Sequence, residues 1–399
     1  AGEDLEVPRT TMKILHVVGS LDRGGVETWL AQMLPHIDRH QYSMDFLVHT
    51  AKPGALDKQI MELGARIMSC LPRLQDGNPL RYAGNFRRLL REYGPYDCVH
   101  SHIHHSSGYI LLLAAMMGVP VRIAHSHTDT CALDRTYAPA RRMYSFTMDV
   151  LIRHFATVGI AVSRSAAPAL FSDSWTADRR WRLCPLGIDL RPFTMAIDSA
   201  AIRAELGIAQ NAFVVGHVGR FAEQKNHRFL VKIAGHLSRI EPNVVFLLVG
   251  DGPIKPEIEV LVQERGLSAN FLFLGVREDV QRLMLGAMDC FLFPSCYEGL
   301  GLVLWEAQAA GLTCVVADTI PDEATVATRL VRRLSLDAAP ELWANELLRV
   351  RPMAGRARDP LSAKFSSCTI EASAAGLTRI YDSCMRNVCA SNRRAVARV

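Results

Sequence analysis

Two glutamates, Glu298 and Glu306, lie eight positions apart around a predicted strand-to-helix turn. The apolar run 291–293 suits a buried strand, a glycine-flanked loop carries Glu298, and a helix-forming segment carries Glu306. In a parallel sheet, such a turn lies at the carboxyl edge of the strands, where ligands bind and where the amides of a helix start attract anions. Glu306 is expected about two turns into the helix. We therefore expect the two carboxylates to contact different parts of one ligand, with an acid and base pair as the alternative.

Two cations follow another predicted strand, which starts at Phe213. Arg220 offers a flat bidentate fork and Lys225 a point charge, and together they suit a diphosphate group. The alternative is a solvated loop in which neither side chain binds a ligand. The position after a strand, at the expected crevice, favours the binding role.

Gly24 and Gly25 follow the first predicted strand and precede an amphipathic helix. Glycine has no side chain to obstruct a close approach, so backbone amides here could meet a diphosphate. A tight turn without a ligand is the alternative. The full G-x-G-x-x-G fingerprint is missing, which argues against a nicotinamide or flavin enzyme.

Histidines cluster after two predicted strands of the first half of the chain. They are His100, His102, His104, His105, His125 and His127. Imidazoles are good metal ligands, but the sequence places no carboxylate or cysteine beside them to complete a tetrahedral set. We therefore expect no metal, and we expect hydrogen bonding in a polar crevice with His127 presented to a substrate.

The elements that must position these residues alternate between strand and helix along the whole chain. Such alternation predicts right-handed βαβ units and parallel sheets covered by helices on both faces. The 399 residues exceed a single core, and the segment around Pro185, Gly187 and Pro192 suits a linker. The sequence therefore predicts two α/β domains, doubly wound and arranged in tandem. The expected boundaries are 12–187 and 188–369, a helix 370–387 crossing back to the first domain, and flexible tails at 1–11 and 388–399.

Composition narrows the class of protein. The formal net charge of +5 is small for this length and argues against nucleic-acid binding. Basic groups do occur on predicted helical faces, at 87–91 and at Arg141 and Arg142. A solvated face is one explanation for them, and peripheral contact with anionic lipid is the other.

The sequence also indicates where in the cell the protein is expected. Segment 1–11 is acidic and has no apolar core, so we expect no signal peptide, and no apolar run reaches membrane-spanning length. Cys98, Cys290 and Cys314 fall in apolar strand-like runs, which predicts buried thiols in a reducing compartment. We expect a cytoplasmic protein, with peripheral attachment to the inner face of the membrane as an option.

These segments together resemble the retaining GT-B glycosyltransferases of family 4, also described as glycosyl transferases group 1. The likeness rests on the Gly-Gly loop, on Gly219-Arg220 with Lys225, on the run 250–253, and above all on Glu298 with Glu306. It extends from residue 12 to about residue 385. Gly-Gly-Val-Glu after the first strand and His-Ser-His after the fifth look most like bacterial capsule and exopolysaccharide transferases.

The resemblance implies a GT-B fold, with two Rossmann-like domains facing an interdomain cleft. It implies a metal-independent hexosyltransferase-type enzyme (EC 2.4), without a cofactor, that uses a nucleotide sugar as substrate. The acceptor would be a lipid-linked sugar or an oligosaccharide, and the product would belong to a cell-surface polysaccharide.

The same resemblance implies a role for each matching residue. Arg220 and Lys225 would hold the diphosphate, with backbone amides at Gly24 and Gly25. Glu306 would accept hydrogen bonds from the ribose. The donor sugar would be held by Glu298 and by the backbone that follows it, at Gly299, Leu300 and Gly301.

The remaining implied roles concern the base and the first domain. Val276 would meet the base through its backbone, and His127 would reach the sugar near the reacting carbon. His102, His104 and His125 would lie on the acceptor side. The alternatives are a related GT-B enzyme, such as a sugar phosphorylase or a nucleotide-sugar epimerase, and a non-catalytic subunit that binds a nucleotide sugar.

Overall fold

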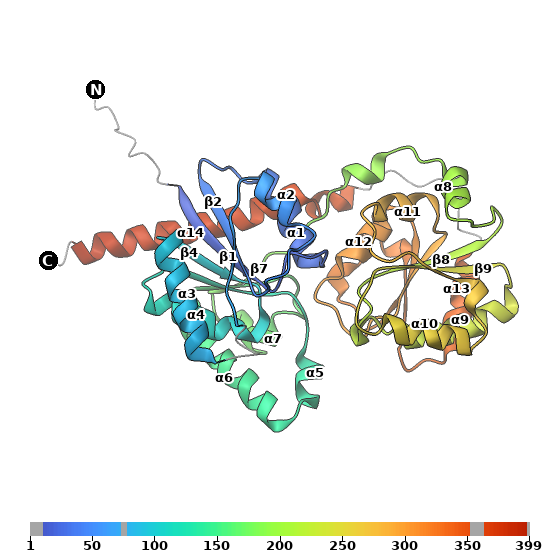
Figure 1. Ribbon diagram of the computed structural model, residues 1–399, viewed down its shortest axis with the longest axis horizontal. Coiled ribbons are helices and arrows are strands. Elements are labelled where there is room, and N and C mark those ends of the chain that lie inside the picture. Colours follow the sequence, from blue (N-terminus) through green and yellow to red (C-terminus); the bar gives the residue numbers. More distant parts are fainter. Residues whose placement is uncertain (1–10, 73–77, 352–362, 397–399) are drawn as a thin grey trace. The chain divides into compact units, whose positions relative to one another are not determined.

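The computed structural model describes residues 11–72, 78–351 and 363–396 of the chain. The chain divides into two compact units, each built on a parallel sheet with helices packed against it (Figure 1). The first unit comprises residues 1–187 and 370–399, and the second comprises residues 188–369.

The first unit contains a seven-stranded sheet in the order β3-β2-β1-β4-β5-β6-β7, and each of its strand pairs is parallel. Its strands are β1 (Met12–Val18), β2 (Tyr42–Val48), β3 (Ile67–Ser69), β4 (Cys98–Ser101), β5 (Val121–Ser126), β6 (Val158–Ala161) and β7 (Trp181–Leu183). Its helices are α1 (Gly25–Met33), α2 (Asp57–Glu62), α3 (Pro79–Tyr93), α4 (Ser107–Met116), α5 (Cys131–Thr136), α6 (Pro139–Phe155), α7 (Pro168–Phe171) and α14 (Ile370–Val396). Short 3-10 turns are η1 (Leu34–His36), η2 (His104–Ser106) and η3 (Trp175–Ala177).

The second unit contains a six-stranded parallel sheet in the order β10-β9-β8-β11-β12-β13. Its strands are β8 (Phe213–Val218), β9 (Val244–Val249), β10 (Phe271–Phe273), β11 (Cys290–Phe293), β12 (Thr313–Ala317) and β13 (Val331–Leu334). Its helices are α8 (Ser199–Glu205), α9 (His227–Ile240), α10 (Lys255–Glu264), α11 (Val280–Gly286), α12 (Leu302–Ala309) and α13 (Pro340–Val350). Its 3-10 turns are η4 (Arg191–Thr194), η5 (Glu223–Lys225), η6 (Ser268–Asn270), η7 (Asp322–Ala324), η8 (Thr328–Leu330) and η10 (Ala363–Ser367).

Both sheets confirm the predicted doubly wound α/β architecture. In each, the strand order reverses beside the first strand, between β1 and β4 in one unit and between β8 and β11 in the other. Ligands in open α/β folds bind beyond the carboxyl ends of the strands at such a switch point. The loops after these four strands are therefore where each unit offers a site.

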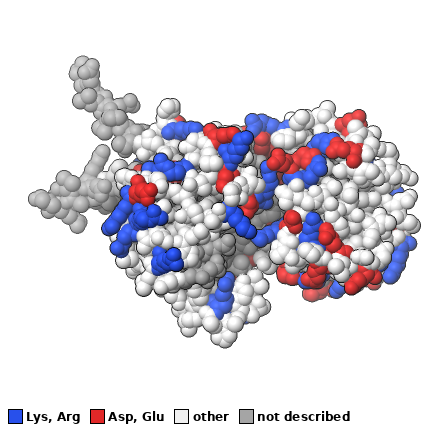
Figure 2. Space-filling view, in the orientation of Figure 1, with Lys and Arg blue, Asp and Glu red and all other residues white. Residues whose placement is uncertain are grey.

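Buried apolar strand residues make up the two cores. Cys98, Cys290 and Cys314 are fully buried in β4, β11 and β12, which confirms the burial expected for these thiols. Helix α9 is amphipathic and contributes its apolar face to the core. The buried residues of that face recur at helical spacing and include Leu230, Ile233, Ala234 and Leu237. Figure 2 shows that positive and negative side chains both occur across the visible face, which agrees with the small net charge.

The last helix, α14, packs on the first unit against α1 and β5. Several polar contacts fix it there, and two of them reach the interior of the unit. The Trp29 Nε1–H donates to Ser373 Oγ at 2.9 Å, and the Tyr381 hydroxyl lies 2.8 Å from Nδ1 of His100. Both partners of the second contact are fully buried, so this helix supports the interior of the first unit.

One boundary differs from the prediction. The helix was expected to end at residue 387, with a flexible tail beyond, but α14 continues to Val396. The segment 388–396 lacks glycine and proline and contains alanines and arginines, which are good helix formers. Residues 1–10 and 397–399 of the predicted tails lie outside the described residues.

Candidate active site

Glu298 lies in the loop after β11, as predicted, and is 6% exposed. Its carboxylate Oε1 accepts a hydrogen bond from Lys225 Nζ at 2.6 Å, which makes a partly buried ion pair between the loops after β8 and β11. The sequence placed these residues at two strand ends. The structure brings them into direct contact at the switch point of the second sheet.

Gln224 is a site residue that the sequence analysis missed. Its side-chain amide donates to the backbone oxygen of Tyr297 at 2.9 Å and to Glu298 Oε2 at 3.3 Å. Its own carbonyl accepts from the amide of Cys296 at 2.8 Å. Both oxygens of the Glu298 carboxylate are thus engaged, so this group is held rigidly as an acceptor. The signal was available, because Gln224 directly precedes the predicted cation Lys225.

The position of Lys225 is set by its surroundings. Its Nζ lies 4.7 Å from the centre of the Phe293 ring, an arrangement in which a cation is attracted to the ring face. A Cβ atom at Gly219 would lie 3.1 Å from Lys225 Cε, closer than ordinary contact. Gly219 therefore leaves room for the lysine stem, and the ammonium group is held at the carboxyl end of β8.

Gly250 explains part of the 250–253 motif. Its φ is +135°, a conformation that favours glycine, and a Cβ there would lie 2.1 Å from the backbone oxygen of Gly219. The loops after β8 and β9 pack together at this point, where the Phe221 amide donates to Asp251 O at 3.0 Å. The motif thus supports the loop that carries Arg220 and Lys225.

Glu306 lies on α12, in a half-buried position. Burial raises the pKa of Glu306 from its usual 4.5 to about 7, while a side-chain hydrogen bond with Gln281 acts in the opposite direction. A carboxyl group in this state is close to half-protonated at neutral pH. Perturbed carboxyl groups of this kind occur most often at functional sites.

Other predicted donor residues lie on the surface or in the turn. Arg220 and Val276 are exposed, and the Arg220 guanidinium has no carboxylate partner in the part of the chain that the structure describes. Leu300 is buried, and Gly301 has a φ of +73° at the start of α12. Gly299 belongs to the same loop. Arg220 is therefore free to meet an anion.

In the first unit, the structure places His127 directly after β5, beside His102 and His125. Nδ1 of His102 lies 2.8 Å from Nε2 of His127. His125 is 0% exposed, so its side chain is sealed inside the first unit, and its place on the acceptor side stays a prediction. His125 belongs to β5 itself, and not to the loop that follows, so neighbouring elements cover its side chain.

His104 and His105 belong to a separate network. Nδ1 of His105 lies 2.6 Å from Oδ1 of Asp149, and its Nε2 lies 3.2 Å from Oδ2 of Asp134. Although burial opposes it, these two carboxylates raise the pKa of His105. His104 Nε2 lies 3.2 Å from the Thr130 hydroxyl. The predicted acceptor-side histidines thus divide between two clusters.

The backbone of the Gly24-Gly25 turn, where an anion was expected to bind, already has a carboxylate beside it. Gly24 is the N-cap of α1 and Gly25 its first residue. A Cβ at Gly24 would lie 2.2 Å from Oε2 of Glu27, so the Glu27 carboxylate lies against this backbone. A carboxylate at a helix start is stabilised by the same partial charge that attracts phosphate. A diphosphate bound here would displace Glu27.

Within the described residues, no helix combines the length and apolar character that a membrane crossing requires.

Comparisons with known proteins agree with this architecture. The sequence profile described as "Glycosyltransferase Family 4" matches residues 23–191, and "Glycosyl transferases group 1" matches residues 198–350. The chain is 37% identical over 340 residues to EpsF of Bacillus subtilis (strain 168), a protein assigned as a glycosyltransferase. That alignment covers 84% of this chain and 87% of EpsF.

More distant relatives carry more specific names. The capsular polysaccharide biosynthesis glycosyltransferase CapH of Staphylococcus aureus is 25% identical, over 84% of this chain and 90% of CapH. An Escherichia coli UDP-Gal:α-D-GlcNAc-diphosphoundecaprenol α-1,3-galactosyltransferase is 28% identical, over 56% of this chain and 58% of that protein. Among solved structures, Anabaena HepE in complex with UDP-glucose superposes with a TM-score of 0.70 at 20% identity. That superposition covers 95% of this chain and all of HepE.

The two parallel-sheet units and their structural neighbours define the GT-B class of glycosyltransferases. Within that class, the chain belongs to glycosyltransferase family 4, the glycosyl transferases group 1.

Proposed function

We propose that this chain transfers a sugar from a nucleotide-sugar donor to a lipid-linked or oligosaccharide acceptor, with retention of configuration, in the synthesis of a cell-surface polysaccharide. The observation that carries the proposal is the Lys225–Glu298 ion pair at the switch point of the second sheet, together with the exposed Arg220 in the same loop as Lys225. The names of CapH and of the diphosphoundecaprenol galactosyltransferase support the acceptor class. The UDP-glucose complex of HepE supports the donor class.

The donor would be held by the second unit. Arg220 and Lys225 would neutralise the diphosphate, and the ribose hydroxyls would donate to Glu306. Glu298 and the backbone at 299–301 would hold the sugar, while the backbone at Val276 would meet the base. Val276 is 57% exposed, so its backbone lies in a segment that a base can approach.

Departure of a nucleoside diphosphate builds negative charge, and preorganised cations stabilise such charge where it develops. Arg220 and Lys225 supply two positive charges for this purpose, so the proposed donor chemistry needs neither a metal nor a cofactor. The Lys225 side chain is 14% exposed beside Glu298, and a largely buried cation acts more strongly on a phosphate than an exposed one.

Glu298 is proposed as a positioning group for the donor sugar. Its two carboxylate oxygens are taken by Lys225 and Gln224, which favours accepting hydrogen bonds over attacking carbon. Retention would then follow from attack on the face that the diphosphate leaves, with the leaving phosphate accepting the proton of the acceptor. His127 is proposed as the first unit's contribution to binding of the transferred sugar.

Peripheral membrane contact is proposed for α6. Met143, Phe146 and Val150 are 66%, 61% and 42% exposed, and their spacing places them on one face of this helix. Arg141 and Arg142 lie on the same helix. Exposed apolar side chains beside basic groups suit the surface of an anionic bilayer, where a lipid-linked acceptor would reside.

The test is a thermal-shift screen of nucleoside diphosphates and their sugars on the full chain, because a ligand of the folded state raises its stability by mass action. We expect one nucleotide series to raise the melting temperature. Arg220→Ala and Lys225→Ala should abolish the shift, while Lys232→Ala on an exposed part of α9 should retain it. Equal shifts in all four proteins would refute the assignment of the donor site.

Product analysis then separates transfer from related chemistries. With donor alone, an epimerase would accumulate the epimeric nucleotide sugar, whereas a transferase releases the nucleotide slowly by hydrolysis. Release that accelerates on addition of an acceptor supports transfer. Binding of donor without hydrolysis or transfer under any acceptor would indicate a non-catalytic subunit.

A further inference from the structure

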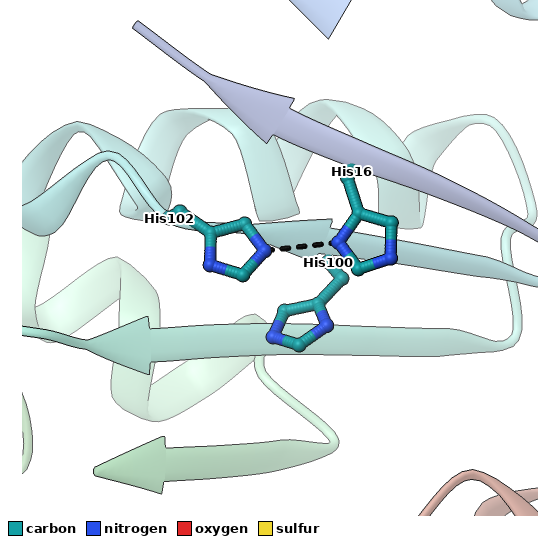
Figure 3. Close-up of side chains that lie close together, drawn as sticks. All are labelled: His16, His100 and His102. Atoms are coloured by element: carbon teal, nitrogen blue, oxygen red, sulfur yellow. Dashed lines mark hydrogen bonds between the residues drawn. The ribbon is translucent and has the colours of Figure 1, made fainter. Parts of the chain in front are cut away.

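Five histidine rings form a stack inside the first unit, at the switch point between β1 and β4. His16 is on β1, His100 is on β4, and His125 is on β5, while His102 and His127 follow the last two strands directly. Figure 3 shows His16, His100 and His102, with the hydrogen bond that joins His16 to His102. Ring centres of contacting pairs lie 3.9–5.3 Å apart. Parallel strands thus bring imidazoles from distant segments into one cluster.

Several ring nitrogens of the stack have no partner. Among the described residues, His16 Nε2, His125 Nε2 and His127 Nδ1 are buried atoms without a hydrogen bond. Each such atom costs about 1–3 kcal/mol in lost solvation. The interior of the first unit therefore holds ligand atoms for a cation.

We infer that His102, His125 and His127 form a binding site for one borderline divalent transition-metal ion, of which Zn²⁺ is the reference. One ring nitrogen from each residue lies within 4.8 Å of the other two. A tetrahedral ion with bonds of about 2.0–2.1 Å to nitrogen separates its ligand atoms by roughly 3.4 Å. The 2.8 Å contact between His102 and His127 must therefore open by about half an ångström, a change within reach of small ring rotations.

A second trio, His16, His100 and His102, meets the same distance criterion. It is the weaker set because His100 already uses both nitrogens, Nδ1 with the Tyr381 hydroxyl at 2.8 Å and Nε2 with His125 Nδ1 at 3.1 Å. Metal binding by that trio would break this arrangement.

The chosen trio gives up the contact between His102 and His127 but keeps its hydrogen bonds to the neighbouring histidines. His102 Nε2 stays 3.0 Å from His16 Nδ1, and His125 Nδ1 stays 3.1 Å from His100 Nε2. Such outer partners fix the tautomer and orientation of a ligating imidazole, and their loss weakens metal affinity about 10–100-fold. Trp29 packs edge-on against His125, with ring centres 5.8 Å apart, and shields the site.

The ligand set selects the kind of ion. Three neutral imidazoles favour Zn²⁺, Cu²⁺, Ni²⁺ or Co²⁺, whereas Mg²⁺ and Ca²⁺ require oxygen ligands. Three protein ligands leave a fourth position open for water. The three ligands belong to the first unit, whereas the cations proposed to hold the diphosphate belong to the second unit.

One consequence rests on the proposed function. If His127 contacts the transferred sugar, a bound ion takes one of its two ring nitrogens and competes with this contact. Micromolar Zn²⁺ should then inhibit transfer while leaving nucleotide binding by the second unit intact. Metal binding itself is independent of this role, so it stands or fails without any transferase assay.

The test uses the full chain after removal of metals with EDTA. Co²⁺ is titrated first, and the visible absorption reports ligand type and geometry. We expect one equivalent of Co²⁺ with the intense bands of a tetrahedral or five-coordinate nitrogen site and without thiolate charge-transfer bands. Thiolate bands would assign the ion to cysteines, such as the exposed Cys296 and Cys389, and would overturn the proposal.

Variants then locate the site by calorimetry with Zn²⁺. His125→Ala and His127→Ala should each weaken the tight event at least 100-fold, and His100→Gln about 10–100-fold. His154→Ala, on an exposed position of α6, is the matched control and should bind as the parent does. The partly exposed His127 is the variant expected to retain its fold, which circular dichroism verifies. Unchanged binding in folded His127→Ala would refute the site.

Discussion

The Glu306→Gln substitution should stabilise the protein at neutral pH while weakening donor binding. Burial holds the pKa of Glu306 at about 7, against 4.5 for an ordinary glutamate. The folded state therefore keeps a proton that the unfolded state releases, and stability falls as the pH rises from about 4.5 to about 7. Above pH 7 the full penalty applies. Glutamine has nearly the same shape and no charge, so it removes this penalty.

The magnitude follows from the pKa. One unit corresponds to 1.36 kcal/mol, so the shift represents about 3 kcal/mol at most. Because Glu306 is only half-buried, solvent screens part of this energy, and we expect a gain of about 1–3 kcal/mol. For a domain of this size, that gain raises the melting temperature by roughly 2–10 °C.

The assay is urea or thermal unfolding of the parent and the variant at several values between pH 4.5 and pH 8.5. The difference in unfolding free energy should be near zero at the acid end, should grow with pH, and should level off above about pH 7. Donor affinity should fall about tenfold, since a charged acceptor of the ribose hydroxyls is lost. A difference that does not change with pH, or a destabilised variant at pH 8, would refute the reasoning.

Three further variants test other regions of the molecule. Glu298→Gln should lower the unfolding free energy by about 3–5 kcal/mol, measured by urea unfolding, because it leaves the buried Lys225 ammonium without its counter-ion. Gly250→Ala should reduce the melting temperature and donor affinity together, since its φ is +135° and the added Cβ would collide with backbone; calorimetry and thermal unfolding measure both. Met143→Ser with Phe146→Ser should reduce cosedimentation with anionic vesicles several-fold and leave sedimentation with neutral vesicles unchanged.

Each of these has a control within the chain. Glu264 is the last residue of α10 and is exposed, so Glu264→Gln should leave the unfolding free energy unchanged. Gly266→Asn is the control for Gly250→Ala. Gly266 also has a positive φ, but a Cβ there meets nothing within 4 Å, so this variant should lose less stability. Leu80→Ser, at an exposed position of α3, controls for general loss of apolar surface in vesicle binding. Equal effects in test and control variants would contradict the corresponding argument.

The fold was predictable because its signal is periodic. Alternation of apolar runs and helical segments predicted both parallel sheets, and the strands that carry Cys98, Cys290 and Cys314 are buried as expected. The predicted end of the last helix, residue 387, was nine residues too early, because α14 ends at Val396. The sequence marks where a helix must stop only through glycine, proline or capping residues, and 388–396 contains neither of the first two.

The candidate site was predictable in part. Residue type and position after a strand placed Glu298 and Lys225 at a ligand-binding edge, but their direct contact depends on the pairing of β8 with β11, which the sequence does not state. The same limitation hid the histidine stack. His16 was not singled out, because it lies 84 residues before His100 and only the pairing of β1 with β4 brings them together.

Binding of a nucleotide sugar by the second unit is proposed to depend on Arg220 and Lys225. Isothermal titration of the full chain with the nucleotide sugar found in the screen, without added divalent ions, tests it most directly. We predict one binding site in the parent and a loss of affinity of at least 100-fold in an Arg220→Ala/Lys225→Ala variant that remains folded. Undiminished binding by that variant would contradict the account.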